Sequence, residues 1–282
     1  MIKVGDYNEF LVMRKTDIGY MLMHKDEEIL LHYKQTLDKE LELNTQISAF
    51  VQLDSKGRMI ATLERPLATV NEYGFASVSE SILSLGVFLN IGTVKDVLLS
   101  KDYLPRDVSL WPQMGEKLLI KLIYKNNHLN ALLATKEELS SRYDLKEYPV
   151  GTILKAHVIR SSNLAINAAT EDKNYVFIST KQFRHKYHLG QEVSIMVIGY
   201  HDDEIVASLN KVAKEQVEED NQIILDYLIR HNGKMPYTAK TSSEELEKVF
   251  HMSRKSFKRA LGALYKEKKV ICSDYETTLN KE

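Results

Sequence analysis

Three stretches of the chain repeat one pattern of apolar and polar residues. Each begins with an alternating run, and the runs read GDYNEFLVMRK from Gly5, EYGFASVSES from Glu72 and GTILKAHVIRS from Gly151. Two more apolar runs separated by a polar turn follow in each stretch, as in LGVFLNIGTVKDVLLS from Leu85. Alternation with a period of two is typical of strands that bury one face, so each stretch predicts at least three strands.

A hairpin closes each stretch. Polar turns at residues 54–57, 126–127 and 202–203 separate its two strands. The spacing within the three hairpins agrees closely. Counted from a Gly or Asn that precedes the first strand, an alanine of the closing strand follows after 17, 16 and 17 positions, and the pairs are Asn44 with Ala61, Gly115 with Ala131, and Gly190 with Ala207. Five strands in about 60 to 70 residues, with no long helix, predict a five-stranded barrel of the oligonucleotide-binding (OB) type.

Helical periodicity replaces alternation beyond residue 209. The run IILDYLIRHNGK from Ile223 has apolar residues at helical spacing and a stop at Gly233. Ser242 and Glu245 have the spacing of a capping box, which predicts the start of a second helix. A third helix and the segment VICSDYETTL, which can form a terminal hairpin, complete the pattern of a winged helix.

The third predicted helix, in SRKSFKRALGALYKEKK from Ser253, has an apolar and a basic face. Phe257, Leu261 and Leu264 form the apolar stripe. Gly262 lies on the opposite face, where it weakens the helix by ~1 kcal/mol relative to alanine, and close approach of a ligand would account for it. The residues predicted to bind phosphate are Arg254, Lys255, Lys258, Arg259 and Lys266. A solvated face without a ligand is the alternative.

These patterns predict a mainly β protein with a C-terminal α+β domain, in which three tandem OB barrels precede a winged helix. The predicted boundaries are 1–64, 65–134 and 149–210 for the barrels, 135–148 for a polar helical linker and 211–282 for the winged helix.

Charge is distributed unevenly in a chain whose net charge is only -1. Residues 1–64 carry 8 Lys and Arg against 11 Asp and Glu, whereas residues 211–282 carry 14 against 12. Two segments are strongly basic: 173–191 has four Lys and Arg and no carboxylate, and 253–269 has seven and a single Glu. Such segments attract polyanions. In the first of them the predicted phosphate ligands are Lys181, Arg184 and Lys186, and His185 and His188 are interpreted as part of the same surface.

The sequence offers little for catalysis. The single cysteine, Cys272, excludes an internal disulfide and a zinc site of several thiolates, and favours a reducing compartment. We find no metalloprotease, nucleophile-elbow or phosphate-loop motif, and we predict no catalytic residue, metal or cofactor. The start MIKVGDYNEF lacks the apolar core of a signal peptide, and no run approaches the roughly 18 apolar residues of a membrane span. We therefore expect a cytoplasmic protein without a membrane partner.

The second stretch resembles the ribosomal S1-type RNA-binding domain. The shared residues are Gly86-x-Phe88-Leu89, then Asp96-Val97-Leu98-Leu99, then Gly115-x-x-x-Leu119. In that family an aromatic residue near the glycine, and a polar or basic residue after the following strand, face the nucleic acid. The resemblance assigns the aromatic position to Phe88 and Tyr20, and the second position to His32 and Lys101.

The third stretch departs from this pattern, with Leu164 in place of the glycine and Ile166 in place of the aromatic residue. Exposed aromatic side chains at this position would stack on bases for roughly 1 to 3 kcal/mol each. Burial in the barrel core is the alternative for Phe88 and Tyr20, because a strand buries every second residue.

The whole chain resembles the conserved virulence factor B family of Gram-positive bacteria, by the order of its parts and by the segments KTSSEELEKVF and MSRKSFKRALGALYKEKKV. The resemblance implies three S1-type barrels and a winged helix, RNA binding without known catalysis, and a role in post-transcriptional control of gene expression.

The leading hypothesis is an RNA-binding regulator in which the basic segments of the third barrel and the winged helix form one surface for single-stranded RNA, uridine-rich RNA included. Its binding would weaken steeply with salt. One alternative is a transcription factor that places the same helix in DNA. Another is a protein-interaction scaffold that docks on the ribosome or on a ribonuclease.

Overall fold

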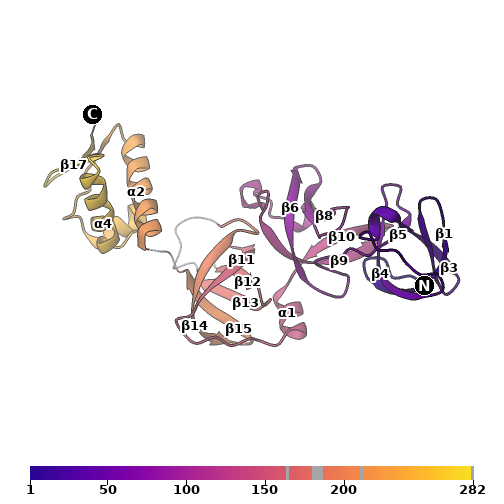
Figure 1. Ribbon diagram of the computed structural model, residues 1–282. Helices are drawn as coiled ribbons and strands as arrows, with labels where there is room; N and C mark the ends of the chain where they lie inside the picture. The colour runs from indigo at the N-terminus through magenta and orange to yellow at the C-terminus, as the bar shows by residue number, and fades with distance from the viewer. Residues whose placement is uncertain (163–164, 180–186, 210–212, 281–282) are drawn as a thin grey trace. The chain divides into compact units, whose positions relative to one another are not determined.

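The computed structural model describes residues 1–162, 165–179, 187–209 and 213–280 (Figure 1). The chain divides into two compact units, residues 1–209 and 210–282. The first unit contains three closed five-stranded barrels, and the second contains three helices and a three-stranded sheet. The predicted fold class is confirmed.

The first barrel has the strand order β1-β2-β3-β5-β4, and β1 closes it by pairing with β4. β3 pairs with β5 in parallel and the other pairs are antiparallel, which is the arrangement of the OB fold. Its elements are β1 (Tyr7–Lys15), β2 (Gly19–His24), β3 (Glu27–His32), the 3₁₀ helix η1 (Tyr33–Gln35), β4 (Gln46–Leu53) and β5 (Met59–Thr62).

The other two barrels have the same strand order. The second consists of β6 (Gly74–Ile82), β7 (Gly86–Asn90), β8 (Val97–Ser100), the 3₁₀ helices η2 (Lys101–Tyr103) and η3 (Val108–Leu110), β9 (Lys117–Lys125) and β10 (His128–Leu133). The third consists of β11 (Ile153–Ser161), β12 (Ala165–Thr170), β13 (Tyr175–Ser179), β14 (Glu192–His201) and β15 (Glu204–Leu209). Helix α1 (Lys136–Arg142) lies between them in the chain.

The three barrels repeat one another down to single hydrogen bonds. The first strand of each has a bulge directly after a buried valine. The carbonyl oxygen of that valine accepts a 2.8 Å hydrogen bond from a backbone N–H whose residue has a positive φ, a conformation that Gly and Asn tolerate best. The donor and acceptor pairs are Asn44 with Val12, Gly115 with Val78, and Gly190 with Val158. The donors are the residues from which the repeat was counted, so the predicted repeat is confirmed.

The closing hairpins also follow the sequence pattern. Residues 126–127 and 202–203 all have positive φ, as type I′ turns require. The first barrel uses Gly57 in its turn, where the φ is +76°. The alanines of the closing strands, Ala61, Ala131 and Ala207, are buried in the three barrel cores.

Close packing joins the first two barrels. Phe50 of β4 is buried among the core residues of the second barrel. At Gly5, where φ is +82°, an added Cβ would lie 2.7 Å from Cδ1 of Leu129 and 2.8 Å from Cγ1 of Val70, so a larger residue there would have to displace these side chains. β4 therefore presents its outer face to the second barrel.

A polar cluster anchors α1 to the second barrel. The Glu138 carboxylate accepts hydrogen bonds from Tyr73 Oη and Lys121 Nζ. Burial by itself would raise the pKa of Glu138, but these hydrogen bonds outweigh it and hold the pKa below its ordinary value. Burial raises the pKa of the Tyr73 hydroxyl, and the hydrogen bond to Glu138 adds to that effect. An apolar cluster with residues of the third barrel lies beside it, and its buried members are Tyr73, Leu119, Ala134, Leu139, Ile159 and Ala169.

The second unit is a winged helix. Its elements are α2 (Ala213–Arg230), β16 (Lys234–Met235), α3 (Ser243–Phe250), α4 (Arg254–Lys266), β17 (Val270–Cys272) and β18 (Thr277–Leu279), and the sheet order is β16-β18-β17. The Ser242 hydroxyl accepts a hydrogen bond from the backbone N–H of Glu245 and donates one to its carboxylate, which confirms the predicted start of α3. None of the helices in the described ranges is long and apolar enough to span a membrane.

Candidate nucleic-acid interface

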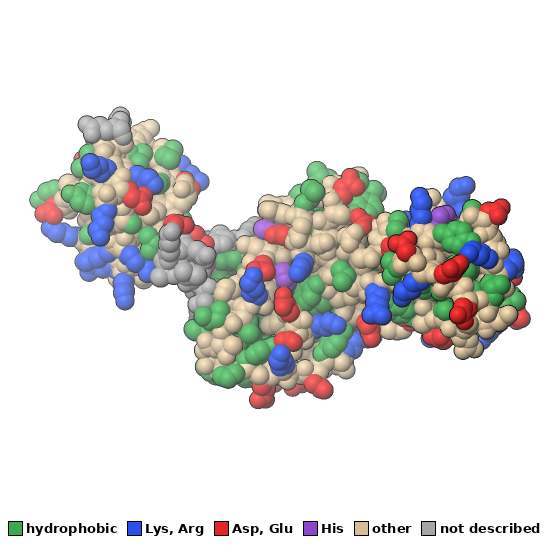
Figure 2. Space-filling view, in the orientation of Figure 1, with side chains coloured by type: hydrophobic (Ala, Val, Ile, Leu, Met, Phe, Trp, Pro, Cys, Tyr) green, Lys and Arg blue, Asp and Glu red, His purple; other side chains and the backbone are tan. Residues whose placement is uncertain are grey.

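Helix α4 has one buried and one basic face. Ser253 caps its first turn by accepting a 3.1 Å hydrogen bond from the backbone N–H of Ser256. Phe257, Leu261 and Leu264 are buried in the core of the domain, as the sequence predicts. Figure 2 shows Lys and Arg side chains gathered along one edge of this unit. The exposed cations that α4 contributes and that lack a carboxylate partner in the described part of the chain are Arg254, Lys255, Lys258 and Lys266.

Arg259 differs from these four cations because it lies close to a carboxylate of the same domain. Its Nη2 atom lies 3.8 Å from Oδ2 of Asp220 on α2, and the Asp220 side chain has no exposed surface. A buried carboxylate requires a nearby positive charge, so Arg259 compensates an internal charge first. Arg259 thus has an internal contact that the other four basic residues of the helix lack, while its side chain is 45% exposed and its phosphate contact stays a prediction. Sequence spacing could not reveal the partner, because Asp220 lies on another helix.

The exposed face of α4 also carries an aromatic residue that the sequence analysis missed. Lys258, Gly262 and Tyr265 follow one another at helical spacing and share this face. Tyr265 is 60% exposed. A Cβ on Gly262 would meet no atom within 4 Å, so packing inside the domain does not require glycine there. The sequence did contain a signal for Tyr265: it follows Lys258 by seven residues, about two helical turns, which places both on the same face.

The wing of the domain differs from α4 in charge. The turn between β17 and β18 is Ser273-Asp274-Tyr275-Glu276, in which Tyr275 is 87% exposed. Asp274 pairs with Lys240 at 2.8 Å between Oδ1 and Nζ. The wing thus combines an exposed aromatic ring with two carboxylates and no Lys or Arg in its turn.

Strand register identifies the equivalent positions on the three barrel surfaces. Phe88 is partly exposed on β7 and lies opposite Leu98 of β8. Counted from the bulge in the preceding strand, the residues at the same position are Met21 in the first barrel and Asn167 in the third. Only the second barrel therefore presents an aromatic side chain at this position.

Tyr20 does not occupy the aromatic position. It is one residue nearer the glycine than Phe88 is, and its equivalent in the second barrel is the buried Val87. Because strand neighbours point to opposite faces, this shift turns Tyr20 into the barrel core, where it is 2% exposed. Its hydroxyl accepts a 3.2 Å hydrogen bond from the backbone N–H of Leu41. The assignment of Tyr20 to base stacking is therefore wrong.

His32 and Lys101 are not equivalent to each other. His32 ends β3, and its Nδ1 accepts a 3.1 Å hydrogen bond from the backbone N–H of Lys34, which caps η1. Ser100 caps η2 in the same way in the second barrel. Lys101 is the next residue and is exposed. The second barrel thus has a serine at the position of His32, with Lys101 beside it.

Most of the basic run of the third barrel falls in a gap between the described ranges. Lys181, Arg184, Lys186 and His185 lie outside the described residues. His188 is described, and its Nε2 lies 2.6 Å from Oε1 of Glu116 in the second barrel. His188 therefore serves a contact between barrels, which corrects its interpretation as part of a polyanion surface. The described residues contain no group of three or more His, Cys, Asp or Glu side chains that could hold a metal ion.

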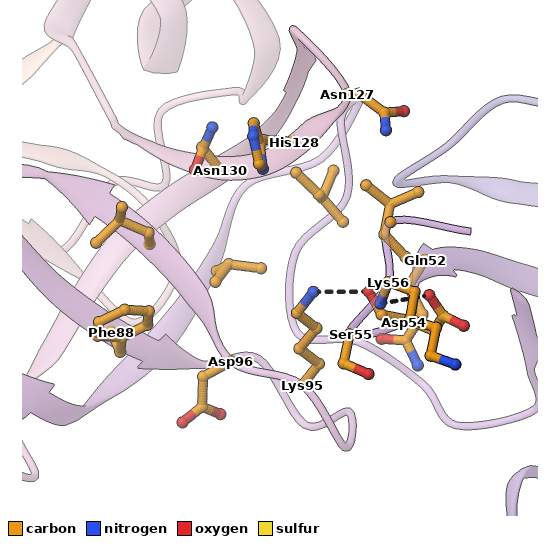
Figure 3. A pocket seen from close by; sticks show the side chains of 15 residues that line it. Gln52, Asp54, Ser55, Lys56, Phe88, Lys95, Asp96, Asn127, His128 and Asn130 are labelled. Atoms are coloured by element: carbon orange, nitrogen blue, oxygen red, sulfur yellow. Dashed lines mark hydrogen bonds between the residues drawn. The ribbon is translucent and has the colours of Figure 1, made fainter. Parts of the chain in front are cut away.

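A pocket of about 490 Å³ lies between the first two barrels (Figure 3). Phe88, Lys95 and Asn130 line it from the second barrel, whereas Gln52 and the turn 54–57 line it from the first. Lys95 Nζ donates a 3.1 Å hydrogen bond to the backbone oxygen of Asp54, which links the two barrels at its edge. No sequence pattern indicates this pocket, because its wall combines residues of two barrels.

Three OB barrels, one with an aromatic residue on its outer face, together with a winged helix whose third helix is basic, define a multidomain nucleic-acid-binding protein. Family profiles agree with this class: residues 4–64 match the S1 domain, residues 73–131 the CvfB first S1-like domain and residues 222–279 the CvfB-like winged helix domain. The chain belongs to the conserved virulence factor B family.

Relatives match over most of their length. Conserved virulence factor B of Staphylococcus aureus (strain N315) is 31% identical over 87% of this chain and 83% of its own. The Bacillus subtilis (strain 168) protein YitL is 31% identical over 95% of this chain and 91% of its own. A crystal structure of a multidomain protein with nucleic acid binding domains from Streptococcus pneumoniae is 26% identical, with a TM-score of 0.63 over 98% of both chains.

Proposed function

We propose that the protein binds single-stranded RNA and acts in post-transcriptional regulation, with α4 supplying phosphate contacts. The observation that carries this proposal is the set of exposed cations on α4 without a carboxylate partner in the described part of the chain: Arg254, Lys255, Lys258 and Lys266. Cations that are not neutralised internally keep their charge for phosphate oxygens.

Three features favour a single strand over duplex DNA. The chain contains three OB barrels, a fold that binds single strands on an open face. Tyr265 and Tyr275 present exposed rings, which can stack on unpaired bases but not on bases inside a duplex. Glu276 in the wing turn repels the phosphates that a wing beside a duplex would approach, and the turn has no Lys or Arg to attract them. A transcription factor that reads duplex DNA is therefore the weaker candidate.

The basic run of the third barrel is a second part of the proposal. Lys181, Arg184 and Lys186 add three positive charges without a carboxylate in the same run, and this part rests on sequence alone. Replacing the three with Gln should reduce RNA affinity at low salt and lower the salt dependence.

The first barrel favours a different partner. Its segment has three more carboxylates than Lys and Arg, and its only tyrosine on β2 is buried. A protein surface, on the ribosome or on a ribonuclease, suits the outer face of β2 in this barrel better than an RNA strand does. In this proposal the protein works in the cytoplasm by binding, without catalysis.

The test is RNA binding by the full chain with Lys255 and Lys258 both changed to Glu. Labelled single-stranded oligonucleotides, uridine-rich ones among them, and a palindromic DNA duplex would be titrated between about 50 and 200 mM salt. The variant should bind every RNA sequence at least about tenfold more weakly, with a salt slope smaller by roughly 0.7 for each phosphate group that the variant no longer neutralises.

A control is Lys234→Glu, which reverses one exposed charge on β16 and so makes half of the charge change of the α4 variant. It should leave RNA affinity near that of the wild type. Equal RNA binding by the α4 variant and the wild type would remove α4 from the interface, and tighter binding to the duplex would favour the transcription factor.

A further inference from the structure

The pocket between the first two barrels has features of a site for a flat polar ligand. Its volume of about 490 Å³ is within the range of small-ligand sites. Both barrels contribute to its wall, and Figure 3 shows Phe88, Asn130 and His128 of the second barrel across from Gln52 and the turn 54–57 of the first.

Phe88 provides an aromatic surface. Its ring is only partly buried although the neighbours on the same strand, Val87 and Leu89, are fully buried. Leu98 lies opposite Phe88 on β8 and also lines the pocket. A half-exposed ring next to an aliphatic side chain is a surface on which a planar base can stack.

Gln52 is the feature that packing does not explain. It points to the outer face of β4, as Phe50 does, and it is 3% exposed. Its side-chain amide makes no hydrogen bond with the described residues and lines the pocket, so its donor and acceptor are open to a ligand there. Asn130 lines the same pocket with a second amide that is equally without a partner in the described part of the chain. Each amide offers a donor and an acceptor side by side, which is the pattern that pairs with the edge of a nucleobase.

The charged residues that line the pocket are two lysines, Lys56 and Lys95, and two carboxylates, Asp54 and Asp96. Asp54 accepts hydrogen bonds from the backbone N–H groups of Lys56 and Arg58 and pairs with the Arg58 guanidinium at 2.7 Å, so its carboxylate is compensated inside the turn. These bonds, the backbone N–H of Arg58 foremost, lower the pKa of Asp54. Lys95 donates to a backbone oxygen and not to a carboxylate, so its positive charge is not neutralised by that contact.

We propose that this pocket binds one unstacked nucleobase of an RNA strand, stacked on Phe88 and selected through the amides of Gln52 and Asn130. Both barrels therefore form the site. The second barrel provides Phe88 and Asn130, and the first provides Gln52, so the second barrel alone would lack one of the two amides that select the base. This inference rests on the proposed function, because α4 would hold the strand while the pocket selects the base.

The test compares homopolymers. The full chain, Gln52→Met and the control Gln46→Met would be titrated with labelled ten-nucleotide oligomers of A, C and U. Gln46 lies on the same strand and is exposed. The wild type should bind one homopolymer best, and Gln52→Met should reduce the ratio of best to worst affinity by at least about fivefold. The Gln46 control should keep the wild-type ratio.

The α4 variant with Lys255 and Lys258 changed to Glu separates the two proposals. It should weaken all homopolymers alike and leave their ratio unchanged, because phosphate contacts carry no base information. No RNA binding by the wild type would overturn both proposals. RNA binding with equal affinity for all three homopolymers, or a ratio that Gln52→Met leaves unchanged, would overturn the pocket alone.

A second measurement uses the unaltered chain and so does not depend on folding of a variant. Ultraviolet crosslinking of the best homopolymer, followed by peptide mapping, should place a crosslinked nucleotide on Phe88 or on residues 127–130. Crosslinks confined to the C-terminal unit would contradict the pocket.

Discussion

The guanidinium of Arg259 on α4 lies 3.8 Å from the fully buried carboxylate of Asp220 on α2. Asp220 therefore belongs to the domain interior, and Arg259, whose side chain is 45% exposed, reaches it from the surface. The pair separates Arg259 from the other cations of α4, and it leads to a prediction about stability.

Arg259→Glu should destabilise the winged helix by about 3 kcal/mol, because it places a second negative charge beside a buried carboxylate. Lys258→Glu, one residue earlier and exposed, should change the free energy of unfolding by less than about 0.5 kcal/mol. Chemical denaturation of the full chain, followed by circular dichroism of the helices, measures both. Combining Arg259→Gln with Asp220→Asn should recover part of the stability, and equal stability of the two Glu variants would contradict the assignment.

Gly262→Ala should stabilise α4 by up to about 1 kcal/mol, because the site is helical, exposed and open. RNA affinity should nevertheless fall, since a methyl group on the exposed face would hold the strand away from the helix. Thermal unfolding and RNA titration of the same sample give the two quantities. A variant that is more stable and binds RNA as the wild type does would show that no ligand approaches Gly262 closely.

Tyr265→Ala should weaken binding to single-stranded RNA by about 1 to 3 kcal/mol, the range for removal of one stacked base. The effect should disappear with an abasic oligomer that has no bases at all, whereas the effect of Lys255→Glu should persist there. Tyr265→Phe is the control and should bind like the wild type, because the ring alone provides the stacking surface. Weak binding by the Phe variant would instead assign the effect to the hydroxyl group.

Tyr20→Ala should destabilise the first barrel by about 3 to 5 kcal/mol, as for other large buried aromatic residues. Phe88→Ala should cost less stability because Phe88 is partly exposed, yet it should reduce RNA binding. The rate of proteolysis of the first barrel measures the loss of stability, and RNA titration measures the loss of binding, in both variants. The reverse order of effects would restore Tyr20 as a stacking residue.

The contact of α1 with the second barrel should depend on pH. The folded pKa of Glu138 lies below its ordinary value of 4.5, so its ionised form contributes stability above pH 4.5 that is lost as the pH falls through the folded pKa. Glu138→Gln should therefore lower the melting temperature at pH 7, and the difference from the wild type should shrink below about pH 4. A difference that is constant from pH 7 to pH 3 would contradict the role of the Glu138 charge.

Local patterns predicted much of the fold. Alternation and turn residues located the strands, and the counted spacing from Asn44, Gly115 and Gly190 marked equivalent hydrogen bonds in three barrels. The strands and turns depend on neighbours a few residues apart, and the hydrogen bonds follow because the same spacing recurs in each barrel. The error at Tyr20 arose from one residue of register, since a shift of one exchanges the inner and outer faces of a strand.

The sequence by itself determined the number and kind of domains, the basic face of α4 and its capping residues. All of these follow from short-range periodicity and from the chemistry of single turns. Only the tertiary structure decided that Arg259 compensates Asp220, that His188 contacts Glu116, and that Gln52 of one barrel lines a pocket of the next. Each of these depends on residues brought together from separate elements, and no local pattern encodes which distant side chain becomes a neighbour.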